Sequence, residues 1–287
     1  MKKIFYSILI FLLILLNFST VCADDVDNEV DFEDTIEVTA SNVSELPKTN
    51  SRRYIVYDRI SKSMIIGKNE DVKSAMASTT KIMTTIVILE KADLNEKVTV
   101  SAKAGGTGGS RLGLKRGDKT SVRDLLYGLM LRSGNDAAVA LAEHVGGSVK
   151  GFAELMNEKA IELGLTNTHF VTPHGLDDAN HYTTALELAK LTDYAMDNET
   201  FAKIVGTKST TIYINNQSRQ INNTNELLGV LNGVVGVKTG FTNNAGRCLV
   251  TETKRNNMDI ITIVLGADTK KDRTKDSVNL IEYAFSK

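Results

Sequence analysis

The stretch AMASTTKIMTTIVILEKA, residues 75–92, combines the pattern of a core helix with one charged residue inside it. Lys81 lies in this segment three residues after Ser78, so one helical turn brings its amine near the serine hydroxyl. Lys81 is therefore either a stray surface lysine or a base placed beside a nucleophile. The apolar residues that recur at helical spacing and predict a buried face are Ile82, Met83, Ile86, Val87, Leu89 and Ala92.

The chemistry of Ser78 and Lys81 depends on their surroundings. A serine at a helix N-terminus lies among free backbone N–H groups, which stabilise developing negative charge. At the ordinary lysine pKa of about 10.4, only about one amine in 10³ is neutral at pH 7. Burial or a second cation lowers that pKa and frees the amine to take the hydroxyl proton. Because Ser-x-x-Lys arises about once by chance in a chain of this length, the pair needs support from elsewhere.

Two further motifs lie downstream. Ser133-Gly134-Asn135 falls where two predicted helices meet and, taken alone, is typical of a helix cap. Lys238-Thr239-Gly240 falls on a predicted strand, where the plain interpretation is a solvent-facing lysine followed by a turn. Gly240 would also allow a substrate backbone to pair along that strand edge.

The hydrophobic periodicity predicts one α+β domain over residues 51–287. Residues 52–58 and 62–68 form a hairpin pattern, and three β-rich runs follow near the C-terminus. We expect an antiparallel sheet built from N- and C-terminal segments and flanked by helices. The C-terminal strands are predicted at 233–242, 246–255 and 258–267, and the helices at 122–147 (two, joined at RSGN), 152–165, 183–197 and 276–287.

The N-terminus predicts export. Two lysines precede an apolar run over residues 4–18, and VCA ends in Ala23, which indicates a signal peptide covering residues 1–23. An uncleaved membrane anchor and a lipoprotein attached through Cys22 are the alternatives. Residues 24–50 are acidic and indicate a flexible leader. After cleavage Cys248 stands alone, so no intramolecular disulfide can form.

Composition argues against several classes of partner. The 287 residues carry a formal net charge of −1, which gives no electrostatic basis for binding nucleic acid. His144, His169, His174 and His181 show no metal-binding spacing, so we expect structural roles for them, and neither a metal nor a cofactor.

The three motifs together, in the order Ser-x-x-Lys, Ser-x-Asn and Lys-Thr-Gly, resemble the set found in penicillin-binding proteins and serine β-lactamases. The sequence is most similar to the low-molecular-mass D-alanyl-D-alanine carboxypeptidases, and the resemblance runs from Arg52 to Phe285. It implies a β-lactamase/transpeptidase-like fold. The segments that carry it are MASTTKIMT, LRSGNDAAVALAEHVGGS, TPHGLDDANHYTTALELAKLT and GVKTGFTNNAGRCLV.

The resemblance implies catalytic roles. Ser78 would attack the carbonyl between two D-alanines of a peptidoglycan stem peptide and form an acyl-enzyme, with Lys81 as general base. Ser133 would relay a proton towards the leaving amine. Asn135 would hydrogen-bond the substrate amide and position Lys81.

The resemblance also implies a binding site. Lys238, Thr239 and Arg273 would face the terminal carboxylate of the substrate, and Gly240 would lie along its backbone. The backbone N–H of Phe241 would complete an oxyanion hole with that of the nucleophile. β-Lactam antibiotics would act as covalent inhibitors, and the protein would associate with the cell wall or peripherally with the membrane.

Two alternatives remain at the level of sequence. A class A-like β-lactamase needs a deacylating glutamate, which residues 163–178 (LGLTNTHFVTPHGLDD) do not contain. Penicillin is therefore expected to inhibit the protein rather than be destroyed. A catalytically silent cell-wall-binding protein of the same fold is the other alternative, and the three intact motifs argue against it.

Overall fold

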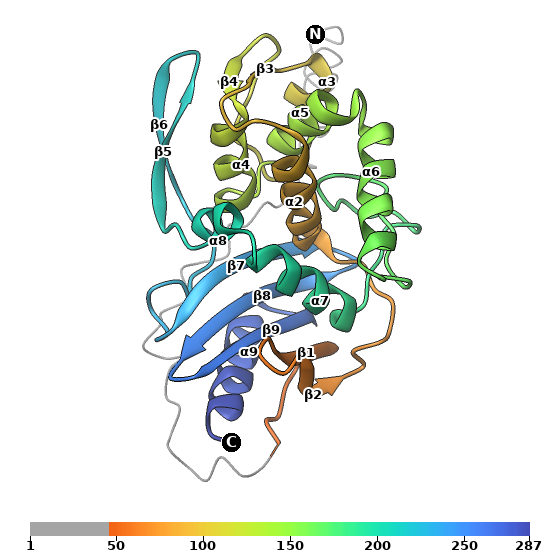
Figure 1. Cartoon of the computed structure of the whole chain (residues 1–287), viewed down its shortest axis with the longest axis vertical. Helices are drawn as coiled ribbons and strands as arrows, with labels where there is room; N and C mark the ends of the chain where they lie inside the picture. The colour runs from red at the N-terminus through yellow and green to blue at the C-terminus, as the bar shows by residue number, and fades with distance from the viewer. Residues whose placement is uncertain (1–45) are drawn as a thin grey trace, which may run out of the picture.

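A five-stranded antiparallel sheet joins the two ends of the described chain. The computed structural model describes residues 46–287, and the sheet has the strand order β2-β1-β9-β8-β7 (Figure 1). β1 pairs with β9 along its whole length, from Arg53 opposite Leu265 to Asp58 opposite Ile260. The predicted assembly from N- and C-terminal segments is thus confirmed. The strands are β1 (Arg53–Asp58), β2 (Ser63–Lys68), β7 (Val234–Thr242), β8 (Gly246–Arg255) and β9 (Met258–Ala267).

Alternate side chains of these strands enter two different apolar layers. Tyr54 and Val56 of β1 pack with α9 (Lys270–Phe285) on one face, whereas Ile55 and Tyr57 join the main core on the other. Successive side chains of a strand point to opposite faces, so both faces of the sheet are covered. Figure 1 shows α9 behind the sheet and α7 in front of it.

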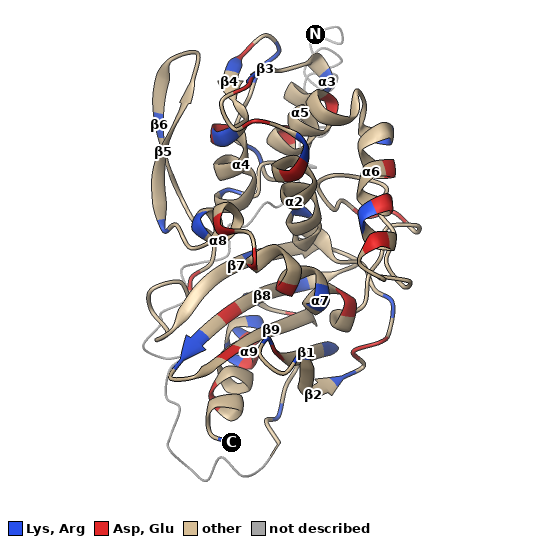
Figure 2. Ribbon diagram, in the orientation of Figure 1, with Lys and Arg blue, Asp and Glu red and all other residues tan. Residues whose placement is uncertain are grey.

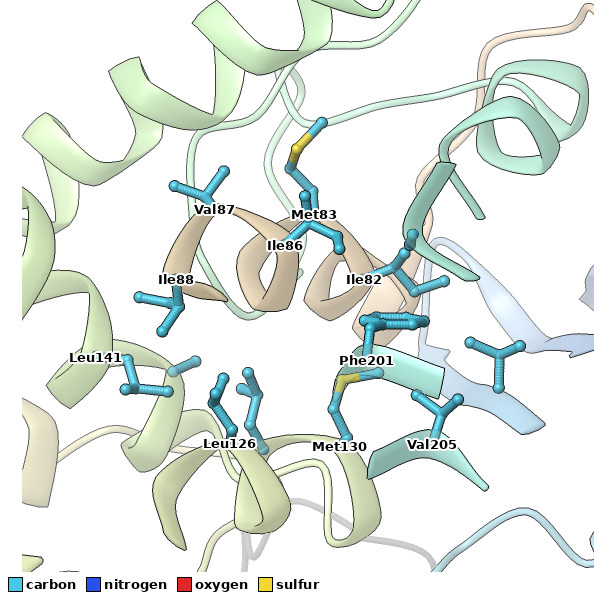
Figure 3. Close-up of a cluster of buried hydrophobic side chains, with 14 of the residues drawn as sticks. Ile82, Met83, Ile86, Val87, Ile88, Leu126, Met130, Leu141, Phe201 and Val205 are labelled. Carbon is cyan, nitrogen blue, oxygen red and sulfur yellow. The ribbon is translucent and has the colours of Figure 1, made fainter. Parts of the chain in front are cut away.

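The helix predicted from residues 75–92 lies at the centre of the main core. It comprises a 3₁₀ turn, η2 (Ala77–Thr80), followed by α2 (Lys81–Lys91). Every residue from Lys81 to Ile88 is buried, so α2 is enclosed on all sides rather than on one face. Figure 3 shows the apolar side chains of α2 facing those of surrounding helices, among them Leu126, Met130, Leu141, Phe201 and Val205.

The remaining helices surround α2, and side-chain caps mark several of their starts. Ser121, Ser148 and Thr184 each accept a hydrogen bond from the backbone N–H three residues on, which satisfies one otherwise unpaired donor. Gly164, with φ of +67°, lies just after the helix that ends at Glu162, a position where glycine is common. These helices are α3 (Ala102–Gly105), α4 (Val122–Leu131), α5 (Asn135–Gly146), α6 (Val149–Glu162), α7 (Ala185–Met196) and α8 (Glu199–Val205).

A second, four-stranded sheet was not predicted. Its order is β3-β4-β5-β6, and the hairpin of β5 and β6 projects beside the helices in Figure 1. Asn215 and Asn216 form the turn of this hairpin with φ of +52° and +63°, a conformation that asparagine tolerates well. The strands are β3 (Lys97–Thr99), β4 (Lys119–Ser121), β5 (Ser209–Ile214) and β6 (Gln217–Asn222).

The predicted signal peptide and most of the predicted leader lie outside the described residues. Within residues 46–287, no helix combines the length and apolar character needed to span a membrane. Asn50 and Ser51 are anchored to α9, because the backbone N–H groups of both donate to Asp276 Oδ2, at 2.9 and 2.8 Å. Figure 2 shows basic and acidic residues interspersed along the elements, in keeping with the formal charge of −1.

Candidate active site

The turn η2 presents Ser78 where the sheet meets the helices. Ala77, immediately before it, has φ of +48°, a left-handed conformation that non-glycine residues seldom adopt. Gly175 packs directly on this turn, since a Cβ atom there would lie 1.8 Å from the Ala77 carbonyl oxygen. The close approach of a glycine therefore helps to define the backbone just before the serine.

The amine of Lys81 lies within hydrogen-bond distance of three oxygen atoms. Its Nζ is 2.8 Å from Ser78 Oγ, 2.8 Å from Asn135 Oδ1 and 2.9 Å from the His174 carbonyl oxygen. A neutral amine has two N–H groups and one lone pair. When Asn135 Oδ1 and the His174 carbonyl accept the two N–H groups, the lone pair faces the Ser78 hydroxyl.

The surroundings of Lys81 favour that neutral form. The side chain is fully buried, and burial lowers its pKa well below the ordinary value of 10.5. The positive charge of Lys238 acts in the same direction, while Asp136 acts against it. The buried setting that the sequence required for a lysine base is therefore present.

The second motif joins α4 to α5 beside Lys81. Ser133 has φ of +58° and is 7% exposed, and Asn135 begins α5. Asn135 Nδ2 donates to the Gly108 carbonyl at 2.9 Å, which directs its Oδ1 towards Lys81. Both ends of this amide are thus fixed by named partners.

A glycine-rich loop, residues 105–117, is held at the site by a buried carboxylate. Asp136 accepts hydrogen bonds from the backbone N–H groups of Leu112, Gly113 and Leu114, at 2.8–2.9 Å. The same loop supplies the Gly108 carbonyl that orients Asn135. Asp136 therefore positions the second motif through the loop.

The third motif lies on β7 against η2. A Cβ atom on Gly240 would lie 3.0 Å from the Ser78 backbone nitrogen, so β7 passes closer to the serine than a side chain at this position would ordinarily allow. Lys238 is buried and its Nζ donates to the Thr239 carbonyl at 2.9 Å. The Thr239 hydroxyl lies 2.8 Å from that of Thr224.

Two predicted binding residues have partners of their own. Phe241 is 37% exposed, and the Arg247 guanidinium lies 3.9 Å from its ring centroid. Arg273 lies in the first turns of α9, and its Nη2 donates to Glu226 Oε1 at 2.5 Å. Arg273 is thus paired with a carboxylate of this chain.

Sequence reasoning missed three contributors to the site. The His174 carbonyl left no signal because a backbone oxygen is independent of the residue that carries it. Thr224 and Glu226 follow the unpredicted second sheet, where no pattern indicated proximity to the third motif or to α9. The residues that the structure describes contain no group of three or more His, Cys, Asp or Glu side chains suited to holding a metal ion.

The geometry is that of an activated serine nucleophile. A hydroxyl beside a buried neutral amine can lose its proton as it attacks a carbonyl carbon. The backbone N–H groups of η2 and the adjacent strand can stabilise the oxyanion that forms. The arrangement suits acyl transfer through a serine ester.

Comparison with known proteins agrees with this chemistry. The D-alanyl-D-alanine carboxypeptidase family matches residues 39–269. D-alanyl-D-alanine carboxypeptidase DacF of Bacillus subtilis is 37% identical over 238 residues, covering 81% of this chain and 61% of the relative. D-alanyl-D-alanine carboxypeptidase DacC of Escherichia coli is 38% identical over 270 residues, which cover 86% of this chain and 64% of that relative.

Solved structures show the same fold. The crystal structure of the Streptomyces K15 DD-transpeptidase superposes with a TM-score of 0.79 at 34% identity, covering 85% of this chain and all of that one. The fold is thus the mixed α+β fold of penicillin-binding transpeptidases. The chain belongs to the D-alanyl-D-alanine carboxypeptidase family. It spans just over three fifths of the length of the first two curated relatives, DacF of B. subtilis and DacA of Haemophilus influenzae.

Proposed function

We propose that this protein is a serine-type D-Ala-D-Ala carboxypeptidase that removes the terminal D-alanine from peptidoglycan stem pentapeptides. The observation that carries the proposal is the 2.8 Å separation between Lys81 Nζ and Ser78 Oγ, at a lysine that is fully buried. Membership of the family supports the substrate class. The proposed domain is residues 51–287, after a cleaved signal peptide (1–23) and an acidic leader (24–50).

In the acylation step, Ser78 Oγ attacks the carbonyl carbon of the penultimate D-alanine while Lys81 Nζ accepts the hydroxyl proton. The backbone N–H groups of Ser78 and Phe241 stabilise the oxyanion. Ser133 relays this proton from Lys81 to the amine of the departing D-alanine, which leaves Lys81 neutral again. A water molecule then attacks the ester with Lys81 again as base, which regenerates Ser78.

Binding of the substrate rests on charge. Lys238, Thr239 and Arg273 hold the terminal carboxylate, because a cation beside a hydroxyl recognises that group well. Gly240 leaves room for the peptide backbone along β7. The protein acts outside the cytoplasmic membrane on the cell wall, and it binds neither a cofactor nor nucleic acid.

A β-lactam would acylate the same serine and remain bound. The segment that reaches Lys81 from residues 163–178 offers the His174 carbonyl oxygen, which cannot accept a proton as a glutamate does. The two aspartates of the segment are engaged elsewhere, Asp177 by the Thr242 hydroxyl and Asp178 by the Asn180 backbone N–H. The nearest following glutamate, Glu187, is held by the backbone N–H of Asn167 and the hydroxyl of Thr168. A deacylating acid of the class A β-lactamase kind is thus not supplied by this segment, which favours inhibition.

Mass spectrometry of the purified protein tests the proposal. Incubation with penicillin is expected to add one antibiotic mass at Ser78, and a pentapeptide ending in D-Ala-D-Ala is expected to release D-alanine. Ser78→Ala should lose both activities, while Ser218→Ala, at an exposed serine of β6, should keep them. Rapid hydrolysis of a chromogenic cephalosporin without D-alanine release would instead establish a β-lactamase. Absence of labelling in the wild type would establish a non-catalytic binder.

Lys81→Ala provides a second test of the same mechanism. Removing the base is expected to slow acylation by about 10²-fold or more, within the range typical of general-base catalysis. The fold should persist, because the change leaves the apolar contacts of α2 in place. The rate of fluorescent penicillin labelling and the circular dichroism spectrum measure the two effects. Acylation at the wild-type rate would remove Lys81 from the mechanism.

A further inference from the structure

A chain of hydrogen bonds leads from a buried histidine to the peptide unit that precedes Ser78. His181 Nε2 lies 2.8 Å from Thr80 Oγ1, and Thr80 Oγ1 donates to the Ala77 carbonyl at 2.8 Å. His181 is 3% exposed and Thr80 is fully buried, so water does not compete for these bonds. The carbonyl at the end of the chain belongs to the residue with φ of +48°.

The partners of His181 fix the direction of this chain. Its Nδ1 accepts a hydrogen bond from the Val171 backbone N–H at 2.9 Å, so Nδ1 carries no proton. In the neutral imidazole the proton then resides on Nε2, which donates to Thr80 Oγ1. Burial lowers the pKa of His181 to about 4, which agrees with a neutral ring. Thr80, having accepted from the histidine, has its own proton free for the Ala77 carbonyl.

The same histidine also anchors the segment that contacts the lysine amine. Val171 begins a short arch, residues 171–175, and two carbonyl groups of this arch accept hydrogen bonds from side chains of α2. The Pro173 carbonyl accepts from Thr84 Oγ1 at 2.7 Å, and the His174 carbonyl lies 2.9 Å from Lys81 Nζ. His181 is therefore linked to both partners of the reaction, through Thr80 to the serine turn and through Val171 to the arch beside Lys81.

This double attachment matters because the turn before Ser78 is strained. A non-glycine residue in the left-handed region is less stable than in an ordinary conformation and persists only when its surroundings hold it. The Thr80 hydroxyl and the close packing of Gly175 both act on the Ala77 carbonyl. Without the hydrogen bond one of these two constraints on the Ala77 carbonyl is lost, so the peptide between Ala77 and Ser78 is expected to be held less firmly beside the amine.

We propose that His181 is a positioning residue for acylation, which acts through Thr80 on the nucleophile turn and through Val171 on the arch that orients Lys81. The inference rests on the proposed function, since it concerns the approach of Ser78 to an acyl donor. His181 itself takes no part in proton transfer, because both of its nitrogens are occupied by Val171 and Thr80.

Substitutions at Thr80 test the first link while keeping the His181 side chain itself. Thr80→Val keeps the shape but removes the hydroxyl, and it is expected to lower the penicillin acylation rate constant at least tenfold, with little change in the preceding non-covalent affinity. Thr80→Ser restores the hydroxyl and should return the rate to within about threefold of the wild type. Thr192→Val is the matched control, since Thr192 is also buried and donates to the Leu188 carbonyl, away from the turn.

Substitutions at His181 test its part directly. His181→Phe removes both hydrogen bonds, whereas His181→Gln keeps an amide N–H that can reach Thr80. The Gln variant is expected to acylate faster than the Phe variant. The double variant Thr80→Val/His181→Phe should be no slower than the slower of the two single variants, because linked residues are not additive.

Several results would overturn the inference. One is a wild-type acylation rate in Thr80→Val. Another is an acylation rate in Thr80→Val that falls only as far as its loss of thermal stability explains, as judged against the control Thr192→Val. A third is an acylation rate in Thr80→Ser that remains as low as in Thr80→Val. If a His181 variant does not fold, the Val and Ser variants at Thr80 still decide the question. Absence of penicillin labelling in the wild type would contradict the proposed function instead, so the two failures are distinguishable.

Discussion

At the scale of single residues, the site depends on two lysine amines, those of Lys81 and Lys238, that are close enough for the charge of one to disfavour protonation of the other. Lys238 lowers the pKa of Lys81, after burial, which has the larger effect in the same direction. The neutral amine is the reactive form. The acylation rate is therefore expected to rise with pH through the folded-state pKa of Lys81, well below 10.5. A lysine buried in this way differs from a surface lysine, which stays charged until a far more alkaline pH.

Replacing the second cation tests this electrostatic argument. Lys238→Gln removes one of the two influences that lower the pKa of Lys81, so the midpoint of the acylation limb should move to higher pH. Penicillin acylation rates measured from pH 5 to 10 give the midpoint in each protein. An unchanged midpoint would show that burial alone sets the pKa. A neutral replacement at the exposed Lys254 provides the control and should leave the profile unchanged.

Glu226 is the residue that engages the predicted carboxylate-binding arginine. Burial acts to raise its pKa, but the Arg273 charge, the Thr274 hydroxyl and Lys270 together lower it below 4.5. A carboxylate with a lowered folded-state pKa stabilises the fold at any pH above its unfolded value. That stabilisation is lost as the pH falls through the folded value.

Glu226→Gln should therefore lower the free energy of unfolding by about 1.5–3 kcal/mol at pH 7, the range for hydrogen bonds to charged groups. The difference from the wild type should shrink as the pH is lowered below 4.5. Urea titrations at neutral and acid pH measure both quantities. Glu282→Gln is the control. Glu282 pairs with Arg255 but is more exposed than Glu226, so its replacement should have a smaller effect. A difference that is independent of pH would contradict the ionic explanation.

At the scale of elements, the contact between β7 and η2 brings the first and third motifs together. A Cβ atom on Gly240 would lie 3.0 Å from Ser78 N and 3.1 Å from Ala77 Cβ. Both distances are shorter than ordinary van der Waals contact, so the turn would have to move by a few tenths of an ångström. A shift of that size changes the distance between a nucleophile and its base.

Gly240→Ala is accordingly expected to slow acylation by about tenfold or more, because small misplacements at a reacting centre have large effects on rate. The melting temperature should fall only slightly, since few apolar contacts change. Stopped-flow acylation and thermal unfolding separate the two effects. Equal losses in both would show that Gly240 matters for packing alone.

Elements with a strong local pattern were predictable from the sequence. The strands near the C-terminus and the hairpin at the N-terminus were confirmed within one or two residues, because β-rich runs such as CLVT in β8 and IITIVL in β9 carry their own signal. The pair of Ser78 and Lys81 followed from helical spacing. The closing helix was wrong at its start, which is Lys270 rather than Asp276, because its first turns are polar and the apolar pattern begins at Val278.

Other parts could not be predicted because they depend on contacts between distant segments. The His174 carbonyl meets Lys81 across 93 positions, and Arg273 meets Glu226 across 47. No local pattern encodes such pairs. The hairpin of β5 and β6 is different, since Asn215-Asn216 between two β-rich runs is a turn signal that the prediction left unused.

At the scale of the whole molecule, the site lies where the helices meet the large sheet, and both parts must stay together for it to exist. Ser78 and Lys81 belong to the segment that enters the helices, whereas Lys238 and Gly240 belong to β7 of the sheet. Cys248 lies in the neighbouring strand β8, opposite Gly240 of β7, and is completely buried. Its thiol is therefore a probe for opening of the sheet beside the site.

Acylation should slow that opening. Burial raises the pKa of Cys248 to about 11, so at pH 8 the native thiol is expected to be unreactive towards a maleimide until the sheet opens. A penicillin bound to Ser78 and held by Lys238, as proposed, would join the two parts of the molecule, and anything that binds only the folded state stabilises it. We expect the labelling of Cys248, located by mass spectrometry, to slow at least threefold in the acylated protein. In Ser78→Ala penicillin should have no such effect. Rapid labelling of the native, unacylated protein would show that β8 opens independently of the site.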